Sequence, residues 1–175
     1  FIIASCSTLV EDENMNKNNV IYKIRSVDSN FSNLETLLFV DIDTQSLLHI
    51  KKGTVLKQYS ISSSYYGTGS KENSLKTPLG RHEIYKKIGN DLPSNAILKG
   101  RVWNGAIADI ILEPIDTDFD HVTSRILWLD GLEVGKNKGK GIDSRNRYIY
   151  IHGTAEEGLI GKPASDGCIR MYNKD

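Results

Sequence analysis

Cysteine, net charge and long apolar runs are all scarce in this chain of 175 residues. Its two cysteines, Cys6 and Cys168, exclude a framework of several disulfides. Lys and Arg balance Asp and Glu at 22 each, and no polybasic block could neutralise a row of phosphates, so no nucleic acid partner is expected. No apolar run reaches the roughly 20 residues that a membrane-spanning helix needs. The length suits one domain with a single core.

The first residues differ in character from the rest of the chain. FIIASCSTLV passes from apolar to small residues and then to cysteine, and polar EDENMNKNN follows, as at the end of an export signal. IASC, ending at Cys6, resembles the bacterial lipobox, whose cysteine becomes lipid-modified; ordinary first residues of a clipped domain are the alternative. We expect residues 1–32 to be the end of an export or lipoprotein signal and a polar tether, in which VIYKI could add an edge strand.

Strand signals dominate from residue 33 to the end of the chain. LLFVDID, LLHIKKG and TVLKQYSIS predict three strands in a meander, and YYGTGSKENSLKTPLG predicts a long loop after them. Further strands are expected around RHEIYKKIG, RVWNGA, DIILEP, SRILWLDGLEV and RYIYIHGT. The turn residues between them have the spacing typical of sandwiches and barrels. The sequence therefore predicts a mostly β fold with minor helix.

Two stretches look like binding motifs but lack essential residues. DTDFDH, residues 116–121, spaces its carboxylates like a calcium loop, yet His121 and Leu127 stand where that loop needs glycine and glutamate. GKNKGKG, residues 135–141, lacks the residue order of a phosphate-binding loop. His49 and His82 lie in predicted strands without the spacing of zinc ligands. We expect an acidic surface turn, a basic hairpin tip and no metal site.

The strongest chemical signal is HGTAEEGLIGKPASDGCIRM, residues 152–171. His152 ends an apolar strand, and Cys168 follows a turn shaped by Ser165 and Gly167 that a sheet could fold back beside that strand. A thiolate attacks carbonyls, an imidazole can hold its proton, and glycine before the cysteine lets backbone amides face a developing oxyanion. The alternatives are a disulfide with Cys6 in a structural lipoprotein, or a small buried hydrophobe.

Three motifs in order, TPLGRHEI, IHGT and SDGCIRM, resemble the L,D-transpeptidase catalytic domain, also called the YkuD domain, from about Leu34 to the end. The resemblance implies a β-sandwich of mixed sheets over residues 33–175, truncated at its C-terminus, with no cofactor. It also implies that the substrate is the stem peptide of peptidoglycan. Cys168 would attack the carbonyl of meso-diaminopimelate in a donor tetrapeptide, expel D-alanine and leave a thioester.

The fate of that thioester stays open. An amine would resolve it into a crosslink, water would make the protein an L,D-carboxypeptidase, and a lysine would attach a protein to the wall. A non-catalytic wall-binding module is a further alternative. The resemblance also implies a place in the cell envelope, periplasmic or extracytoplasmic, to which a lipid on Cys6 would add a membrane anchor.

The resemblance gives roles to individual residues around the cysteine. It implies His152 as general base and later acid, a continuing wall at Gly153 and Thr154, and an oxyanion site at the amides of Gly167 and Cys168. Arg170 would brace the site or meet a substrate carboxylate.

Asp166 departs from the family pattern, which usually has histidine at this position. By its charge alone, an aspartate two residues before Cys168 should disfavour the thiolate. We expect Asp166 to point away from the sulfur and to pair with Arg170 or a backbone amide.

Overall fold

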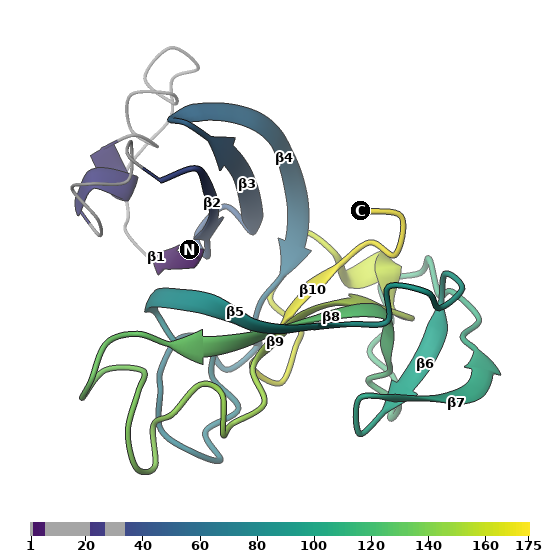
Figure 1. Ribbon diagram of the computed structural model, residues 1–175. Coiled ribbons are helices and arrows are strands. Elements are labelled where there is room, and N and C mark those ends of the chain that lie inside the picture. The colour runs from purple at the N-terminus through teal and green to yellow at the C-terminus, as the bar shows by residue number, and fades with distance from the viewer. Residues whose placement is uncertain (1, 6–21, 27–33) are drawn as a thin grey trace.

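Nearly all of the regular secondary structure that the chain forms is β-strand (Figure 1). The computed structural model describes residues 2–5, 22–26 and 34–175. Its strands are β1 (Ile2–Ser5), β2 (Thr36–Asp41), β3 (Ser46–Lys51), β4 (Thr54–Ser62), β5 (Gly80–Ile88), β6 (Ala96–Lys99), β7 (Val102–Ile107), β8 (Val122–Gly131), β9 (Tyr150–Thr154) and β10 (Ile169–Met171). A 3-10 turn, η2 (Glu157–Leu159), and a helical turn at 22–26 complete the regular structure described. The predicted mostly β class with minor helix is confirmed.

Parallel and antiparallel pairs join these strands into a mixed sheet that closes on itself. The predicted meander is present, because β2 pairs with β3 and β3 with β4, both antiparallel. β4 then pairs with β10, β10 lies parallel to β9, and β9, β8 and β5 follow as antiparallel neighbours. β1 closes the ring by lying parallel to β2 and antiparallel to β5. The hairpin β6–β7 extends from β8 outside this ring.

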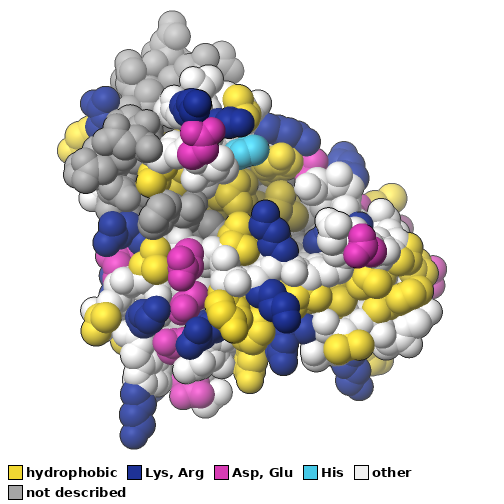
Figure 2. All heavy atoms as spheres, viewed as in Figure 1, with side chains coloured by type: hydrophobic (Ala, Val, Ile, Leu, Met, Phe, Trp, Pro, Cys, Tyr) yellow, Lys and Arg dark blue, Asp and Glu magenta, His cyan; other side chains and the backbone are white. Residues whose placement is uncertain are grey.

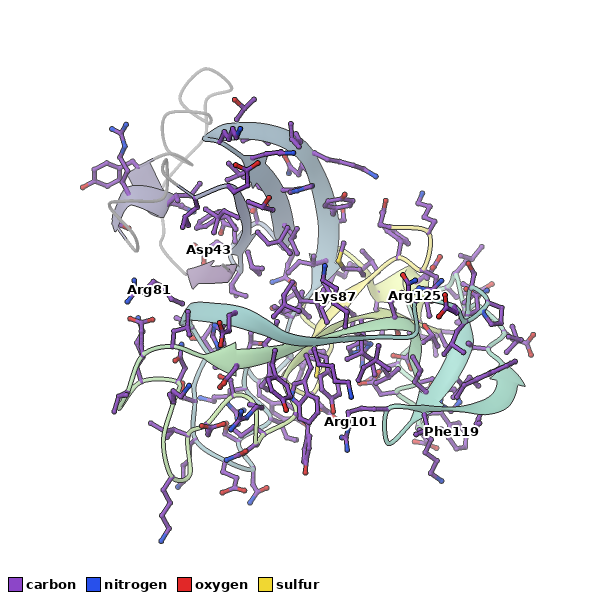
Figure 3. All side chains as sticks on the ribbon, in the orientation of Figure 1. Asp43, Arg81, Lys87, Arg101, Phe119 and Arg125 are labelled. Carbon is purple, nitrogen blue, oxygen red and sulfur yellow. The ribbon has the colours of Figure 1, made fainter. Side chains whose placement is uncertain are left out.

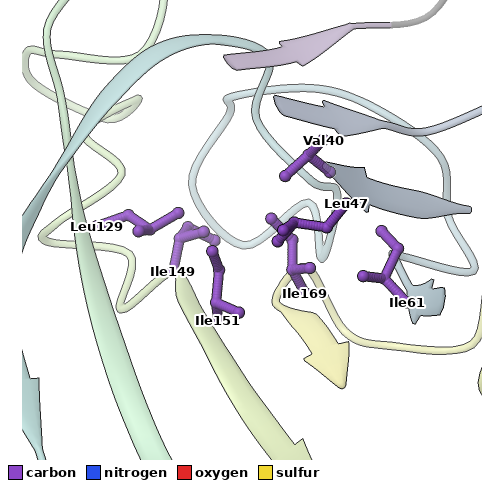
Figure 4. Close-up of a cluster of buried hydrophobic side chains, with 7 residues drawn as sticks. All are labelled: Val40, Leu47, Ile61, Leu129, Ile149, Ile151 and Ile169. Atoms are coloured by element: carbon purple, nitrogen blue, oxygen red, sulfur yellow. The ribbon is translucent and has the colours of Figure 1, made fainter. Parts of the chain in front are cut away.

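The main core lies between the β2–β4 layer and the layer of β8, β9 and β10 (Figure 4). Its buried side chains are aliphatic and come from both layers: Val40, Leu47, Ile61, Leu129, Ile149, Ile151 and Ile169. Successive side chains of a strand point to opposite faces. Since Ile151 and Ile169 point into the core, their neighbours in β9 and β10 point to the outer face of the sheet. That face carries His152 and, just before β10, Cys168.

Two local predictions were wrong, and two short strands were not predicted. DIILEP forms no strand: the segment from 108 to 121 is irregular and is tied to residues 155–158 by the backbone bonds Ile111 N–H to Ala155 O and Gly158 N–H to Ile111 O. The described part of VIYKI is helical, with Ile24 buried in a second cluster, so it adds no edge strand. β6 and β10 were not expected, because strands of four and three residues are too short to display alternation.

The surface mixes charges and apolar groups unevenly. Figure 2 shows side chains of both charges spread over one face, and apolar side chains at the right, where Figure 1 places β6 and β7. All six residues of β7 are exposed, including Val102 and Ile107. Within the described residues, no helix has the length and apolar character to cross a membrane. The lipobox prediction falls on Cys6, outside the described residues, and stays a prediction.

Candidate active site

The parallel pair β9–β10 brings the predicted cysteine and histidine together. Its register sets His152 beside Arg170 and Ile151 beside Ile169, so Cys168, one residue before β10, lies next to Tyr150. The Tyr150 amide donates a hydrogen bond to the sulfur at 3.4 Å. Cys168 and His152 are therefore diagonal neighbours on the same face of two adjacent strands. Cys168 carries a free thiol.

His152 is held in the form that a general base requires. The ring is buried, and its Nδ1 lies 2.7 Å from the Gly153 carbonyl oxygen. Because a carbonyl oxygen only accepts, Nδ1 carries the proton and Nε2 keeps its lone pair. Burial lowers the pKa of His152, and the weaker opposing effects of Asp120 and of the Gly153 carbonyl do not reverse this direction. The imidazole is therefore neutral at pH 7.

Cys168 is also neutral at rest. Burial raises the pKa of its thiol to about 12, with Asp120 adding to the rise, while the Tyr150 amide, Arg170 and Arg147 act in the opposite direction. The thiol also donates to the Tyr148 carbonyl oxygen at 3.5 Å. With a neutral thiol and a neutral imidazole, a thiolate would form at Cys168 only as the thiol proton leaves.

The turn before the cysteine is fixed from within and from the long loop. Ser165 Oγ donates to the Cys168 carbonyl at 2.6 Å and accepts the Gly167 amide at 3.3 Å. Gly167 has a φ of +116°, and a Cβ there would lie 3.3 Å from the Lys76 carbonyl oxygen, so the position favours glycine. Thr77 Oγ1 donates to the Gly167 carbonyl at 3.0 Å.

Thr77 has a role that sequence reasoning did not find. The motif TPLG lies at the end of the predicted long loop, and β5 begins at its last residue, Gly80. Thr77 itself is buried and also accepts the Ser64 amide at 3.0 Å, so it ties the end of β4 to the nucleophile turn. Thr77 lies 90 positions before Gly167, and the sequence gave no signal of that contact.

Arg170 is buried between two carboxylates. Its Nη1 lies 2.9 Å from Glu156 Oε2 and its Nη2 lies 2.7 Å from Asp120 Oδ2. Glu156 is fully buried, and its other oxygen accepts both the amide and the hydroxyl of Thr117. Of the two predicted roles, these contacts favour bracing, since the single positive charge of the guanidinium is already paired with two carboxylates.

The expected partner of Asp166 was wrong. Arg170 pairs with Asp120 and Glu156 instead, and Asp166 is exposed with no hydrogen bond or ion pair to any residue that the structure describes. It lines a cavity of about 240 Å³ with two tyrosines, three further aspartates, Thr117, Ala164 and Arg170. DTDFDH, predicted as an acidic surface turn, supplies those three aspartates, and Asp120 reaches the buried arginine.

Gly153 and Thr154 close the end of β9. A Cβ on Gly153 would collide with the side chain of Asn173, so the strand needs glycine there. Asn173 Nδ2 donates to the Thr154 carbonyl at 2.6 Å, and Thr154 Oγ1 accepts the Glu156 amide at 3.1 Å. Both residues thus continue the strand from His152 to the ion pair of Arg170. No group of three metal-binding side chains occurs in the described ranges.

A family model agrees with these motifs. The model of the YkuD family, the L,D-transpeptidase catalytic domain, matches residues 35–175. Among solved structures, an L,D-transpeptidase from Xylanimonas cellulosilytica is 19% identical to this chain at a TM-score of 0.41. The match covers 79% of this chain and 50% of that protein's chain. An L,D-transpeptidase from Mycobacterium smegmatis is 16% identical at a TM-score of 0.41, covering 79% and 49%. The chain spans about half the length of each. No curated protein matches it.

Proposed function

The chain belongs to the YkuD family of L,D-transpeptidase catalytic domains, and from that premise we propose that it is a peptidoglycan L,D-transpeptidase acting through a thioester on Cys168. One observation carries the proposal: β9 and β10 place a free thiol and a neutral histidine on the same face of adjacent strands. A cysteine and a histidine so placed suit nucleophilic acyl transfer.

The proposed reaction conserves the proton that the cysteine releases. Sγ attacks the carbonyl of the third stem residue while its proton passes to Nε2 of His152, and the carbonyl oxygen becomes an oxyanion. The oxyanion collapses, the bond to D-alanine breaks, and the imidazolium returns the proton to the leaving amine. An acceptor amine then attacks the thioester, gives a proton to His152, and releases the sulfur, which takes that proton back.

Each charge near the pair favours the ionised form of one member and disfavours the ionised form of the other. Asp120 raises the pKa of His152, which favours the imidazolium, but it also raises the pKa of Cys168, which disfavours the thiolate. Arg170 lowers both pKa values, so it favours the thiolate and disfavours the imidazolium. Because Asp120 and Arg170 form one ion pair, their effects on proton transfer largely offset each other.

The site supports an enzyme better than a binding module. A neutral Nε2 and a free thiol on one face are what acyl transfer needs, whereas binding alone would need neither. For the amides of Gly167 and Cys168, the oxyanion role stays a proposal, and the Gly167 amide must leave Ser165 Oγ to take part. A place in the cell envelope and a lipid on Cys6 belong to the same proposal.

A mass measurement tests the nucleophile. The full chain is incubated with a carbapenem, which acylates the cysteine of such enzymes, and its intact mass is compared with that of Cys168→Ala. We expect a stoichiometric adduct that the variant lacks. A folded protein with a free thiol and no adduct would refute the thioester and leave the wall-binding module.

A second measurement identifies the acceptor. A tetrapeptide stem is supplied with and without an excess of a second stem that offers its amine. A crosslinked dimer is expected when the amine is present. Release of D-alanine without dimer in both mixtures would identify an L,D-carboxypeptidase instead.

A further inference from the structure

Arg101 occupies a strained position at the tip of the hairpin β6–β7. Lys99 and Val102 pair with each other, so Gly100 and Arg101 form a two-residue turn. Their φ values are +56° and +70°, both in the left-handed region. Turns of this type favour glycine and asparagine, and a long side chain there is held at a cost in backbone strain. A residue in such a conformation persists only when surrounding contacts hold it there.

Three aromatic residues fix the guanidinium of Arg101. It lies over the ring of Trp128 at 4.8 Å and over the ring of Tyr148 at 5.0 Å. Its Nη1 donates to the Tyr150 hydroxyl at 3.1 Å. Arginine has five N–H donors, and Arg101 makes no other side-chain hydrogen bond within the part of the chain that the structure describes. Figure 3 places Arg101 beyond β8, on the side away from β2–β4.

The same two tyrosines hold the sulfur. The Tyr150 amide donates to Cys168 Sγ, and the thiol donates to the Tyr148 carbonyl. Tyr148 itself has a φ of +57°, which aims its carbonyl at the thiol while its ring meets Arg101. Arg101 therefore contacts the side chains of the two tyrosines whose backbone groups bond to the sulfur.

Other arginines near the sulfur are already occupied. Arg170 is matched by two carboxylates, and Arg147 donates to the carbonyls of Gly69 and Lys76. The flank near Asp166 carries several carboxylates, which repel an anion. An anionic group next to the reacting carbonyl is therefore attracted to the Arg101 side.

We infer that Arg101, clamped by Trp128, Tyr148 and Tyr150, binds the C-terminal carboxylate of the donor stem, one residue beyond the bond that Cys168 attacks. This inference rests on the proposed function. One residue spans about 3.5 Å, so that carboxylate lies close to the attacked carbonyl. The planar guanidinium fork matches a carboxylate, and a side chain already ordered by two rings loses little entropy on binding.

The first test compares two donors and two variants. A tetrapeptide stem with a free C-terminal carboxylate is compared with the same stem ending in a carboxamide, by kcat/KM for release of the fourth residue. We expect the protein to prefer the acid by about tenfold to a hundredfold, as for charge-assisted hydrogen bonds. Arg101→Asn, which keeps the left-handed turn, should lose that preference. Arg101→Lys should retain only part of it.

Arg145→Gln is the matched control. Arg145 stacks on Tyr85 at 5.0 Å and pairs with Asp130. Tyr85 in turn contacts Trp128, the ring under Arg101. The control should keep the preference for the acid. An unchanged preference in Arg101→Asn, or an equal loss in both variants, would overturn the inference.

The second test does not depend on any peptide reaction. Rates of alkylation at Cys168 are measured with anionic iodoacetate and neutral iodoacetamide, and the modified cysteine is located by peptide mass. We expect Arg101→Asn to lower the ratio of the two rates several-fold, and Arg145→Gln to leave it unchanged. A lowered ratio with no turnover of either stem would refute the proposed function and leave an anion site at Arg101. An unchanged ratio would overturn the anion site even if stems are turned over.

Discussion

Arg170 and Arg101 are held by different kinds of partner. Arg170, two residues along β10, is 1% exposed and ion-paired to Asp120 and Glu156. Arg101 comes from a hairpin outside the closed sheet and is held by aromatic rings and one hydroxyl. One arginine has its charge cancelled by the fold, and the other keeps its charge and most of its donors available.

The difference shows how arginine can be either a structural residue or a binding residue. A buried charge is tolerated only when it is paired, so its partners make it part of the framework. Aromatic faces attract a guanidinium without cancelling its charge, so they can order it and still leave it able to bind. Partners, and not the arginine itself, therefore separate a brace from a binding group.

The largest expected effect is on stability and comes from removing a partner of the buried Arg170. Glu156→Ala leaves Arg170 paired with Asp120 alone, and it leaves the buried Nη1 of Arg170 and the donors of Thr117 without the carboxylate that accepts from them. We expect a loss of about 3–5 kcal/mol in the free energy of unfolding, measured with urea. Asp166→Ala, which breaks no ion pair, should change it by about 0.5 kcal/mol at most. Equal small effects in both variants would show that the brace is not structural.

Removing a single atom tests the aromatic side. Tyr150→Phe keeps the ring but deletes the hydroxyl that accepts Arg101 Nη1. We expect the preference for the acid stem to fall about threefold to tenfold, with stability within about 1 kcal/mol of the parent, because the lost bond is partly exposed. A large loss of stability would instead make Arg101 a brace like Arg170.

The pH dependence of acylation distinguishes the surroundings of Arg170 from those of Arg101. Because the pKa of His152 is lowered, the acid limb of the acylation rate should lie below pH 6.5. Asp120 raises that pKa, so Asp120→Asn should move the limb to still lower pH. Arg101→Asn should leave the limb in place. A limb that moves upward in Asp120→Asn would contradict the electrostatic role given to the Asp120–Arg170 pair.

The smallest expected effect is on the pH dependence of stability and comes from His82, away from both arginines. His82 is buried, with Nδ1 on the Gly80 carbonyl and Nε2 on Ser144 Oγ, and burial lowers its pKa. The unfolded chain therefore binds a proton below pH 6.5 that the folded chain does not, so stability falls as the pH drops through this range. His82→Asn should make this decline shallower in urea unfolding followed from pH 7 to pH 5. An unchanged slope would assign the acid sensitivity to other groups.

Much of the fold and of the proposed catalytic pair could be predicted from the sequence. Alternation in LLFVDID, LLHIKKG and TVLKQYSIS predicted β2, β3 and β4, because a strand with one buried face repeats every two residues. The strand ending at His152 and the glycine turn before Cys168 were local signals as well. Their placement on one face followed from the β9–β10 register, which matches what the sequence led us to expect.

Contacts between distant segments escaped prediction for a physical reason. Asp120 and Arg170 are 50 positions apart, and Arg101 and Tyr150 are 49 apart, so no local pattern links them. DIILEP looked like a strand because its residues favour one, but Ile111 bonds to Ala155 and Gly158 in an irregular segment instead of to a strand.

By itself, the sequence determined the strand-rich class, the glycine that the nucleophile turn requires and the identity of a cysteine and a histidine suited to acyl transfer. These follow from periodicity and from the chemistry of single residues. Only the tertiary structure decided that both groups are buried, that Arg170 is paired with two carboxylates and that Arg101 contacts aromatic rings instead of a carboxylate. Burial and pairing set a side chain's charge and its free donors, and both depend on which distant segments pack against it.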